Sequence, residues 1–281
     1  MLDFPDVITI PLAKWIDAAM SWLLNNLDPV FDAIGFIILQ VVVGFETLFL
    51  FIPWFLFIPL VGLAGWKLVG RKRTGVSFMI LLFLIGTFGY WELAMRTLSL
   101  VIASVFFSLI IGVPLGIKMA RSDRAESIMK PMLDGMQTMP SFVYLIPALM
   151  FFGMGKVPAM FATIIYAVPP VIRLTNVGIR TVDQEAVEAS KAFGATPRQV
   201  LFDVQLPLAK PSIMVGINQT TMMALAMVVI GSMIGAKGLG MEVLLAINRI
   251  EVGRGFEAGL SIVFLAIIID RITYSFSKKK K

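Results

Sequence analysis

The 26 residues PSIMVGINQTTMMALAMVVIGSMIGA, at positions 211–236, form the longest stretch of the chain without an acidic or basic residue. A helix needs about 20 apolar residues to cross the hydrocarbon core of a bilayer. This stretch therefore predicts a transmembrane helix. The whole chain agrees, because 58% of its 281 residues are hydrophobic, only 15% are charged and the mean hydropathy is +0.88. Such a composition excludes an ordinary soluble domain.

Six further stretches lack acidic and basic residues, and most approach the length that a crossing needs. Together with 211–236 they predict seven transmembrane helices, the last of which crosses only if Asp270 and Arg271 lie at the membrane interface. The predicted fold class is an all-α polytopic membrane protein, a bundle of about seven transmembrane helices. The six stretches are 47–66, 74–91, 97–117, 135–155, 157–172 and 258–269.

The basic residues are divided unequally between the two sides that seven crossings define. With the N-terminus outside, 18 of the 24 Lys and Arg residues fall on the side of the C-terminus. Cytoplasmic loops of membrane proteins carry the excess of basic residues. We therefore predict an outside N-terminus and a cytoplasmic C-terminus. The basic tail 278–281 does not decide this, because 14 residues against 6 remain without it.

The segment 1–46 predicts an N-terminal unit of helices that lie on the outer membrane surface. Its first residues are acidic where a signal peptide would have basic ones. Apolar residues in 12–28 recur at helical spacing, which is typical of an amphipathic surface helix. The stretch 31–43 is apolar but short, so we expect it to be interfacial as well. The alternative is an eighth crossing there, which would place the N-terminus inside. The transmembrane domain then occupies 47–277.

The chain contains neither histidine nor cysteine. It therefore lacks the usual general base, the thiolate nucleophile and the common ligands of transition metals. The glycines before Lys156 lack the GxxxxGK[ST] spacing of a phosphate-binding loop. We expect a chain that is not an enzyme, binds no metal or cofactor and has no nucleic-acid partner.

The longest polar stretch between spans, 173–210, lies on the predicted cytoplasmic side. Thr181 and Gln184 are spaced as a capping box, which predicts the start of a short helix. Gly194 predicts the end of that helix in the left-handed conformation. The side chains expected on its apolar side are Val182, Ala186, Ala189 and Phe193.

A second short helix is predicted directly after Gly194. Thr196 and Gln199 are spaced as another capping box, and Pro197 stands at the first helical position. We expect this helix to end at Leu206 and Pro207. The sequence thus predicts two short helices at an angle beneath the membrane, a shape suited to contact with a partner.

The same loop carries a recognisable motif. The residues EAS at 188–190 are followed after three residues by Gly194 and after nine more by VQLP at 204–207. This spacing resembles the coupling loop in permease subunits of bacterial ABC importers. The chain departs from the usual pattern at Ser190, where a second alanine is usual, and at Val204, where isoleucine is usual.

Longer stretches narrow the resemblance to permeases for glycine betaine, proline betaine and related quaternary amines. They are LDGMQTMPSFVYLIP at 133–147, INQTTMMALAMVVIGSMIG at 217–235 with GLG at 238–240, and DRIT at 270–273. The resemblance implies an ABC type I importer permease in the bacterial cytoplasmic membrane that moves glycine betaine or a related compatible solute inward during osmotic stress. Choline, carnitine and proline remain alternative substrates.

The resemblance also implies partners and roles. The partners are ABC ATPase subunits, which use ATP and Mg, an extracellular substrate-binding protein and a second permease copy in a homodimer. In the loop it implies Glu188 as the polar contact to the ATPase, Ala189 and Ser190 as closely packed small residues and Gly194 as the bend. Leu206 and Pro207 complete the set of coupling residues. We also expect cytoplasmic basic residues, including those at 71–73, to contact anionic lipid.

A translocation path is harder to read, because no charged residue lies near the middle of a span. Polar groups in lipid must face protein or water, so polar residues of the fourth and sixth spans are candidates to line the path. Hydrogen bonding between helices, or packing for the tyrosines, is the alternative role. The candidates are Gln137, Thr138, Ser141, Tyr144, Asn218, Gln219, Thr220 and Thr221.

A secondary transporter or channel is the alternative class. It would use ion-coupling carboxylates or a ring of polar residues along a pore, and it would not need a capped cytoplasmic protrusion. The sequence therefore favours the importer permease.

Overall fold

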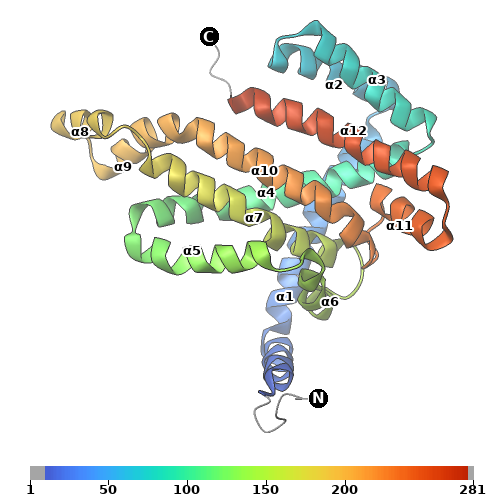
Figure 1. Cartoon of the computed structure of the whole chain (residues 1–281), viewed down its shortest axis with the longest axis horizontal. Helices are drawn as coiled ribbons and strands as arrows, with labels where there is room; N and C mark the ends of the chain where they lie inside the picture. Colours follow the sequence, from blue (N-terminus) through green and yellow to red (C-terminus); the bar gives the residue numbers. More distant parts are fainter. Residues whose placement is uncertain (1–9, 278–281) are drawn as a thin grey trace, which may run out of the picture.

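The computed structural model describes residues 10–277, in which helices are joined by short turns (Figure 1). This confirms the predicted all-α class. Five of the described helices are long and apolar enough to cross a membrane, and a bent pair makes a sixth if it counts as one span. The elements are α1 (Leu12–Phe51), α2 (Trp54–Val69), α3 (Lys72–Thr87), α4 (Trp91–Arg121), α5 (Asp123–Thr138), the 3-10 turn η2 (Ser141–Tyr144), α6 (Leu145–Phe152), α7 (Lys156–Arg180), α8 (Gln184–Ala192), α9 (Pro197–Gln199), the π-helical turn η3 (Val200–Gln205), α10 (Leu206–Ser232), α11 (Leu239–Arg249) and α12 (Val252–Ser277).

The structure differs from the predicted seven spans at the N-terminal end. The predicted span 47–66 is wrong, because α1 ends at Phe51 and α2 begins only at Trp54. Pro53 between them is extended, and its ring has no amide hydrogen with which to continue a helix. Helices α2 and α3 hold 16 residues each, about 24 Å at 1.5 Å per residue, and pair as a hairpin around Gly70. Each is shorter than the expected crossing.

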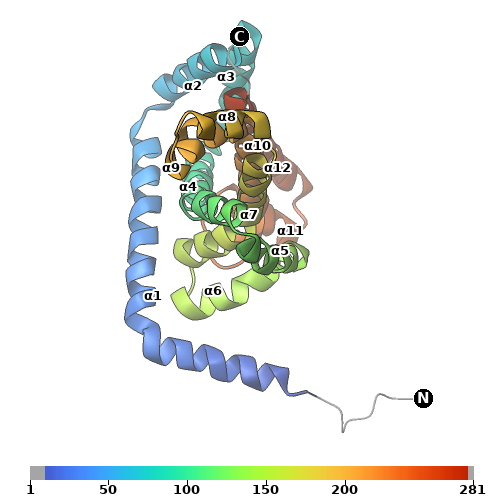
Figure 2. The same cartoon turned by 90° about the vertical axis from the view of Figure 1, so that its left-hand side faces the viewer.

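Helix α1 is the largest departure from the predicted N-terminal unit. It runs without a break through Pro29 and past Glu46, where the sequence predicted separate short helices. Figure 2 shows α1 as a long helix beside the other helices, with a bend in its lower part. The first nine residues and the basic tail 278–281 lie outside the described residues.

Helix α1 crosses the start of α7 instead of running along it. Gly35 lies against Phe152 and Val157, while Glu46, about three turns later, pairs with Lys156. Gly35 and Glu46 are thus far apart on α1, but the residues that they contact, Val157 and Lys156, are adjacent at the start of α7. Glu46 is only 8% exposed, and its second oxygen lies 2.5 Å from Nη1 of Arg96 on α4. This ion cluster ties the three helices together at one level.

The predicted span 135–155 is a bent pair. Helix α5 and the segment Ser141–Phe152 meet at 107°. Pro140 lies at the break, and Met139 before it is extended, because the residue preceding a proline avoids the helical conformation. The hydroxyl of Tyr144 donates to the carbonyl of Met136 at 2.5 Å and so closes the bend.

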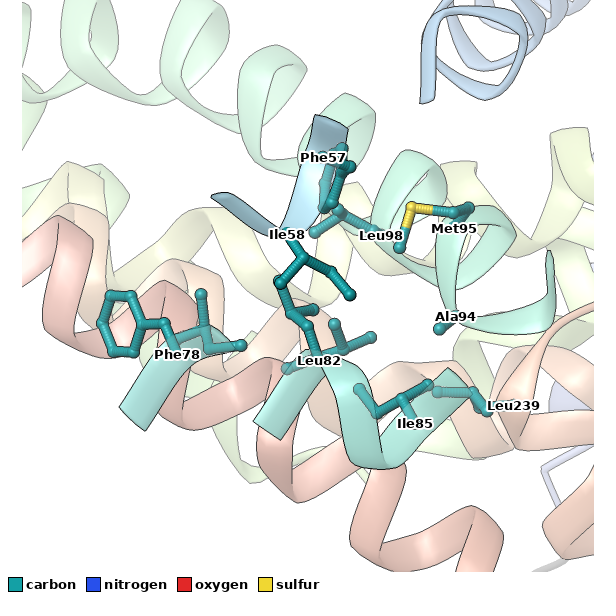
Figure 3. Close-up of a cluster of buried hydrophobic side chains, with 11 residues drawn as sticks. Phe57, Ile58, Phe78, Leu82, Ile85, Ala94, Met95, Leu98 and Leu239 are labelled. Atoms are coloured by element: carbon teal, nitrogen blue, oxygen red, sulfur yellow. The ribbon is translucent and has the colours of Figure 1, made fainter. Parts of the chain in front are cut away.

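The hairpin of α2 and α3 packs on the rest of the bundle through an apolar cluster. Figure 3 shows Phe57 and Ile58 of α2 and Phe78, Leu82 and Ile85 of α3 gathered with residues of α4 and with Leu239 of α11. Leu265 and Ile268 of α12 complete the buried set. The hairpin is therefore fixed to α4 and α12.

The central helices α4, α7 and α10 lie close together because glycines form their contacts. A Cβ atom on Gly116 of α4 would lie 2.7 Å from the carbonyl oxygen of Ile172 and 2.6 Å from the Cβ of Thr175, both on α7. In lipid, small residues let helix backbones approach, and van der Waals packing then supplies much of the association energy. The α4–α7 contact thus depends on Gly116.

Replacing Gly116 with alanine is expected to destabilise the protein by about 1–3 kcal/mol, because the backbone of α7 must move to admit the methyl group. The thermal unfolding midpoint of the detergent-purified chain measures the effect. Gly135→Ala in α5 is the matched control, because no atom lies within 4 Å of a Cβ at that position. Equal midpoints for the two variants would contradict the assignment of this contact.

Candidate functional site

Helices α8 and α9 and the turn η3, which follow α7, form a protrusion at one end of the molecule (Figure 1). Helix α8 begins at Gln184, and its N-cap is Asp183, whose Oδ1 accepts a hydrogen bond from the amide of Glu185 at 3.0 Å. The predicted capping box of Thr181 and Gln184 is therefore wrong. Thr181 still belongs to the last turn of α7, where its hydroxyl donates to the carbonyl of Val177 at 2.8 Å. Its side chain is thus unable to cap the next helix.

Gly194 ends α8 in the left-handed conformation, with φ of +83°, which confirms the predicted bend. Its amide donates to the carbonyl of Lys191 at 2.9 Å, and the amide of Ala195 donates to the carbonyl of Ser190 at 3.1 Å. This pair of bonds is the Schellman motif, which satisfies carbonyls that the helix end leaves free. Glycine adopts this conformation without steric cost.

The second predicted capping box is confirmed. The side chains of Thr196 and Gln199 each accept a bond from the other's backbone amide, and Pro197 stands in the first helical turn. The predicted end at Leu206 and Pro207 is wrong, because the helix continues through the π-helical turn η3 into α10. In that turn the amide of Leu206 bonds to the carbonyl of Leu201, five residues back. Pro207, which has no amide hydrogen, is accommodated directly after it.

As a result, the second helix of the protrusion and the sixth predicted span form one helix of 36 residues, Pro197–Ser232. Helix α8 is fixed against it through Val187, which is 4% exposed and packs in a cluster with Val200, Leu201 and Ala209. Helix α8 is therefore joined to α10 through a packed contact and a continuous helix.

The predicted apolar side of α8 is only partly correct. Val182 is buried in this cluster and Ala186 is half-buried, but Ala189 is exposed and Phe193 is 94% exposed. The start of the helix two residues later than predicted makes Val187 the inward side chain. Phe193 follows the last helical residue and projects from the tip.

The outer surface of the protrusion combines charge, small side chains and an aromatic ring. Glu188, Ala189 and Gly194 are exposed and Ser190 is half-buried. On the second helix the guanidinium of Arg198 lies over the ring of Phe202, 5.8 Å from its centroid. These two residues line a groove of about 460 Å³ together with Thr196, Gln199 and Asp203. Leu206 is half-buried and Pro207 exposed, beyond the π-helical turn.

Sequence reasoning did not assign Phe193 to this surface. Its position directly before the left-handed glycine was the available signal, because the residue at a helix end is not held against the helix face. Phe193 therefore presents a large apolar side chain to solvent at the tip of the protrusion.

The base of the protrusion is held by Arg180. Its guanidinium lies 2.8 Å from Asp123 and 3.1 Å from Glu126, and it donates to the carbonyl of Met119 at 3.1 Å. Helices α4, α5 and α7 are thus joined next to α8. Within residues 10–277 no three acidic side chains gather closely enough to hold a metal ion.

The structure places the predicted path residues in two groups. Gln137 and Thr138 are exposed at the end of α5, Ser141 is half-buried, and Tyr144 is buried beside Tyr166 with 6.1 Å between ring centroids. All four lie around the bend between α5 and α6.

The second group lies on α10. The amide nitrogen of Asn218 donates to Asp270 at 3.0 Å, and its oxygen accepts from the hydroxyl of Thr273 at 2.6 Å. Asn218 therefore joins α10 to α12, the alternative role considered for it. Thr221 bonds within its own helix, Gln219 is exposed, and the buried hydroxyl of Thr220 has no partner within the described residues.

The opposite end of the bundle carries α11 and the turn that follows it (Figure 1). Ile250 in this turn has φ of 58°, a left-handed conformation that a β-branched residue adopts only with strain, and it is 85% exposed. Arg254 nearby pairs with Glu242 and Glu251. Burial, with a smaller contribution from Glu242, raises the pKa of Tyr90 beside this cluster. A charged cluster thus adjoins an exposed apolar turn.

Comparisons with known proteins agree with this geometry. Residues 112–281 match the family described as binding-protein-dependent transport system inner membrane component. The chain is 50% identical to the glycine betaine/carnitine transport permease protein GbuB of Listeria monocytogenes, over 99% of both chains. It is 46% identical to the glycine betaine/proline betaine transport system permease protein ProW of Escherichia coli, over 97% of this chain and 77% of the relative. It is 45% identical to the glycine betaine transport system permease protein OpuAB of Bacillus subtilis, over 97% of this chain and 96% of the relative.

Solved structures show the same fold. Two crystal forms of the inward-facing MetNI methionine ABC transporter align with TM-scores of 0.56 and 0.55 at 21% and 22% identity. They cover 65% and 64% of this chain and 94% and 89% of the solved chains.

Proposed function

Because the chain belongs to the family of inner membrane components of binding-protein-dependent transport systems, we propose that it carries glycine betaine or a related compatible solute into the cell. The observation that carries this proposal is the 50% identity to a glycine betaine/carnitine permease over almost the full length of both chains. The chain is a multi-pass membrane subunit of a transporter and not an enzyme, and ATP hydrolysis belongs to a separate subunit. Choline, carnitine and proline are the alternative substrates.

The protrusion is the proposed contact with the ATPase. Glu188 supplies a polar contact, Ala189 and Ser190 allow close approach, and Gly194 sets the angle between α8 and the helix that follows. The 36-residue helix Pro197–Ser232 supports this role, because α8 packs against it through Val187 and it continues unbroken into the sixth predicted span. Closure of two ATPase subunits around ATP would then move α10 as a lever.

Two features support the proposed orientation. The end of the bundle that carries α8 also holds most of the basic residues, which favours the cytoplasm. The opposite end carries α11 and the ion cluster of Glu46 with Arg96 and Lys156. In this orientation α1, which includes most of the N-terminal unit 1–46, lies towards the outer surface of the domain 47–277.

The permease acts as a homodimer in this proposal, because a pair of ATPases that close together needs two protrusions. A substrate-binding protein delivers the solute to the end that carries α11. The path inside the membrane includes Gln137, Thr138 and Ser141 at the bend and Gln219, Thr220 and Thr221 on α10. Asn218 and Tyr144 position helices beside it through the hydrogen bonds that they already make.

Uptake by the reconstituted complex tests the substrate directly. We expect ATP-dependent accumulation of labelled glycine betaine in vesicles that contain the permease, the ATPase and the binding protein. Carnitine, choline and proline are then added separately in unlabelled excess. The degree to which each one reduces the uptake of labelled glycine betaine ranks them as alternative substrates. Accumulation that does not depend on ATP would support a secondary transporter or channel and contradict the proposal.

The strained turn at Ile250 gives a separate prediction about the outer surface. Ile250→Asn is expected to raise the stability by about 1 kcal/mol, because asparagine tolerates the left-handed conformation. The same change is expected to reduce stimulation of ATP hydrolysis by the binding protein, because it removes an exposed apolar contact. Thermal unfolding and ATPase assays measure the two effects. Ile247→Asn, on the helical part of the same surface, is the control without strain relief, and a lower midpoint for Ile250→Asn than for this control would refute the prediction.

A further inference from the structure

A basic cavity of about 710 Å³ lies between the α2–α3 turn and the C-terminal end of α12. Its walls carry four cationic side chains, from Lys67, Arg71, Arg73 and Arg271, and no acidic side chain. Like charges that share a cavity repel one another, and the repulsion is stronger where the surroundings are apolar. The cavity therefore favours an anionic occupant.

The cations of this cavity have little internal compensation. Among the described residues, no ion pair involves Lys67, Arg71 or Arg73. Arg271 lies 4.0 Å from Asp270, but the other oxygen of that carboxylate accepts the hydrogen bond from Asn218. Most of the positive charge is thus available to a ligand.

The cavity also contains hydrogen-bond donors that could bind an anionic ligand. Helix α3 begins at Lys72, and no side chain caps its first turn, in which the amide of Thr74 donates to the carbonyl of Arg71. The N-terminus of a helix carries a partial positive charge and binds phosphate groups well. The hydroxyl-bearing Thr74 and Ser275 also line the cavity. Several guanidinium groups together with a helix N-terminus are typical of a phosphate site.

The remaining wall of the cavity is apolar. Leu68, Leu81 and Ile267 lie in the lining together with the buried ring of Phe78. Inorganic phosphate would make no favourable contact with apolar side chains. The glycerol backbone of a lipid and the first carbons of its acyl chains would pack against them. The cavity thus combines cationic and apolar lining residues, which suits an amphipathic ligand such as a phospholipid.

The position in the bundle agrees with a lipid ligand. Figure 1 shows the α2–α3 turn and the C-terminal end of α12 near the middle of the long axis, at the ends of these helices that point away from α11 and towards α8, the direction proposed to lead to the cytoplasm. Anionic lipids give the cytoplasmic leaflet its negative surface potential, which attracts basic residues near it.

We propose that this cavity binds the phosphate headgroup of an acidic phospholipid from the cytoplasmic leaflet. Lys67, Arg71 and Arg73 bind the phosphate from the hairpin, Arg271 binds it from α12, and the apolar wall receives the start of the acyl chains. The bound lipid joins the α2–α3 hairpin to the end of α12. The choice of leaflet rests on the proposed orientation, whereas the headgroup chemistry does not.

Native mass spectrometry of the purified full chain tests the proposal. The chain is extracted in detergent with equal amounts of phosphatidylglycerol and phosphatidylcholine, and the retained lipids are counted. The test variant combines Lys67→Gln, Arg71→Gln and Arg73→Gln. The matched control combines Lys118→Gln, Arg121→Gln and Arg124→Gln, three exposed cations that lie outside the cavity.

Wild type and control are expected to retain phosphatidylglycerol in preference to phosphatidylcholine, and the test variant to retain at least about tenfold less phosphatidylglycerol. Ser275→Glu, which adds a carboxylate to the wall and keeps all four cations, should weaken retention as well. Equal retention by wild type and both cavity variants would overturn the proposal. Displacement of the lipid by excess inorganic phosphate would instead identify a site for soluble phosphate and also overturn it. None of these readouts depends on transport, so failure here is distinct from failure of the proposed function.

Discussion

Replacing Gly194 with proline is expected to abolish ATP-dependent uptake while the chain still inserts and folds. Proline fixes φ near −65°, whereas Gly194 has φ of +83°, so the backbone between α8 and the second helix must change direction. Proline also removes the amide that donates to the carbonyl of Lys191. Because no atom lies within 4 Å of a Cβ at this position, backbone conformation and not crowding causes the effect.

The matched control is Gly194→Asn. Asparagine adopts the left-handed conformation more readily than other non-glycine residues and keeps the amide hydrogen. We expect this variant to retain most of the uptake and the proline variant to retain less than about a tenth of it, since a lever that points in the wrong direction cannot follow the ATPase. Uptake and ATP hydrolysis are measured in the same vesicles. Full coupling in the proline variant would refute the lever.

The second large effect is expected at Phe193. An aromatic ring that is buried on binding commonly contributes 2 kcal/mol or more to an interface, which corresponds to about a thirtyfold change in affinity. Phe193→Ser is therefore expected to weaken retention of the ATPase by about tenfold or more during purification in detergent. Ser also leaves the fold intact, because the Phe193 side chain is 94% exposed.

Ile247→Ser is the control for Phe193→Ser. It removes an exposed apolar side chain from α11, at the opposite end of the bundle from α8 (Figure 1). The control should retain the ATPase like the wild type. Equal retention by the two variants would show that Phe193 does not contact the ATPase.

The fold class could be predicted because the thickness of the bilayer requires long apolar helices, which are visible in the sequence as uncharged stretches. The left-handed Gly194 and the capping box at Thr196 could be predicted as well, since each is decided within a few residues. The end of the second helix could not be predicted from Pro207, because the six-residue π-helical turn Val200–Gln205 lets the helix continue through this proline, and such turns leave no strong pattern in sequence.

Other features depend on tertiary contacts. The charge of Glu46 led us to predict that the N-terminal unit ends there. In the structure Glu46 is buried between Arg96 and Lys156, and α1 continues past it. Likewise, the inward side of α8 is set by where the helix starts, a shift of two residues that the pattern alone did not show. The hydrogen bonds of Asn218 with Asp270 and Thr273 join residues more than 50 positions apart.

The central claim is that the protrusion faces the cytoplasm, where the ATPase contacts it. The chain contains no cysteine, so a single cysteine at position 193 can be labelled without interference. We predict that, when the permease is produced without its ATPase, a membrane-impermeant maleimide modifies Phe193→Cys in inverted membrane vesicles and not in intact cells, while Ile250→Cys shows the reverse pattern. Modification of Phe193→Cys in intact cells would contradict the account.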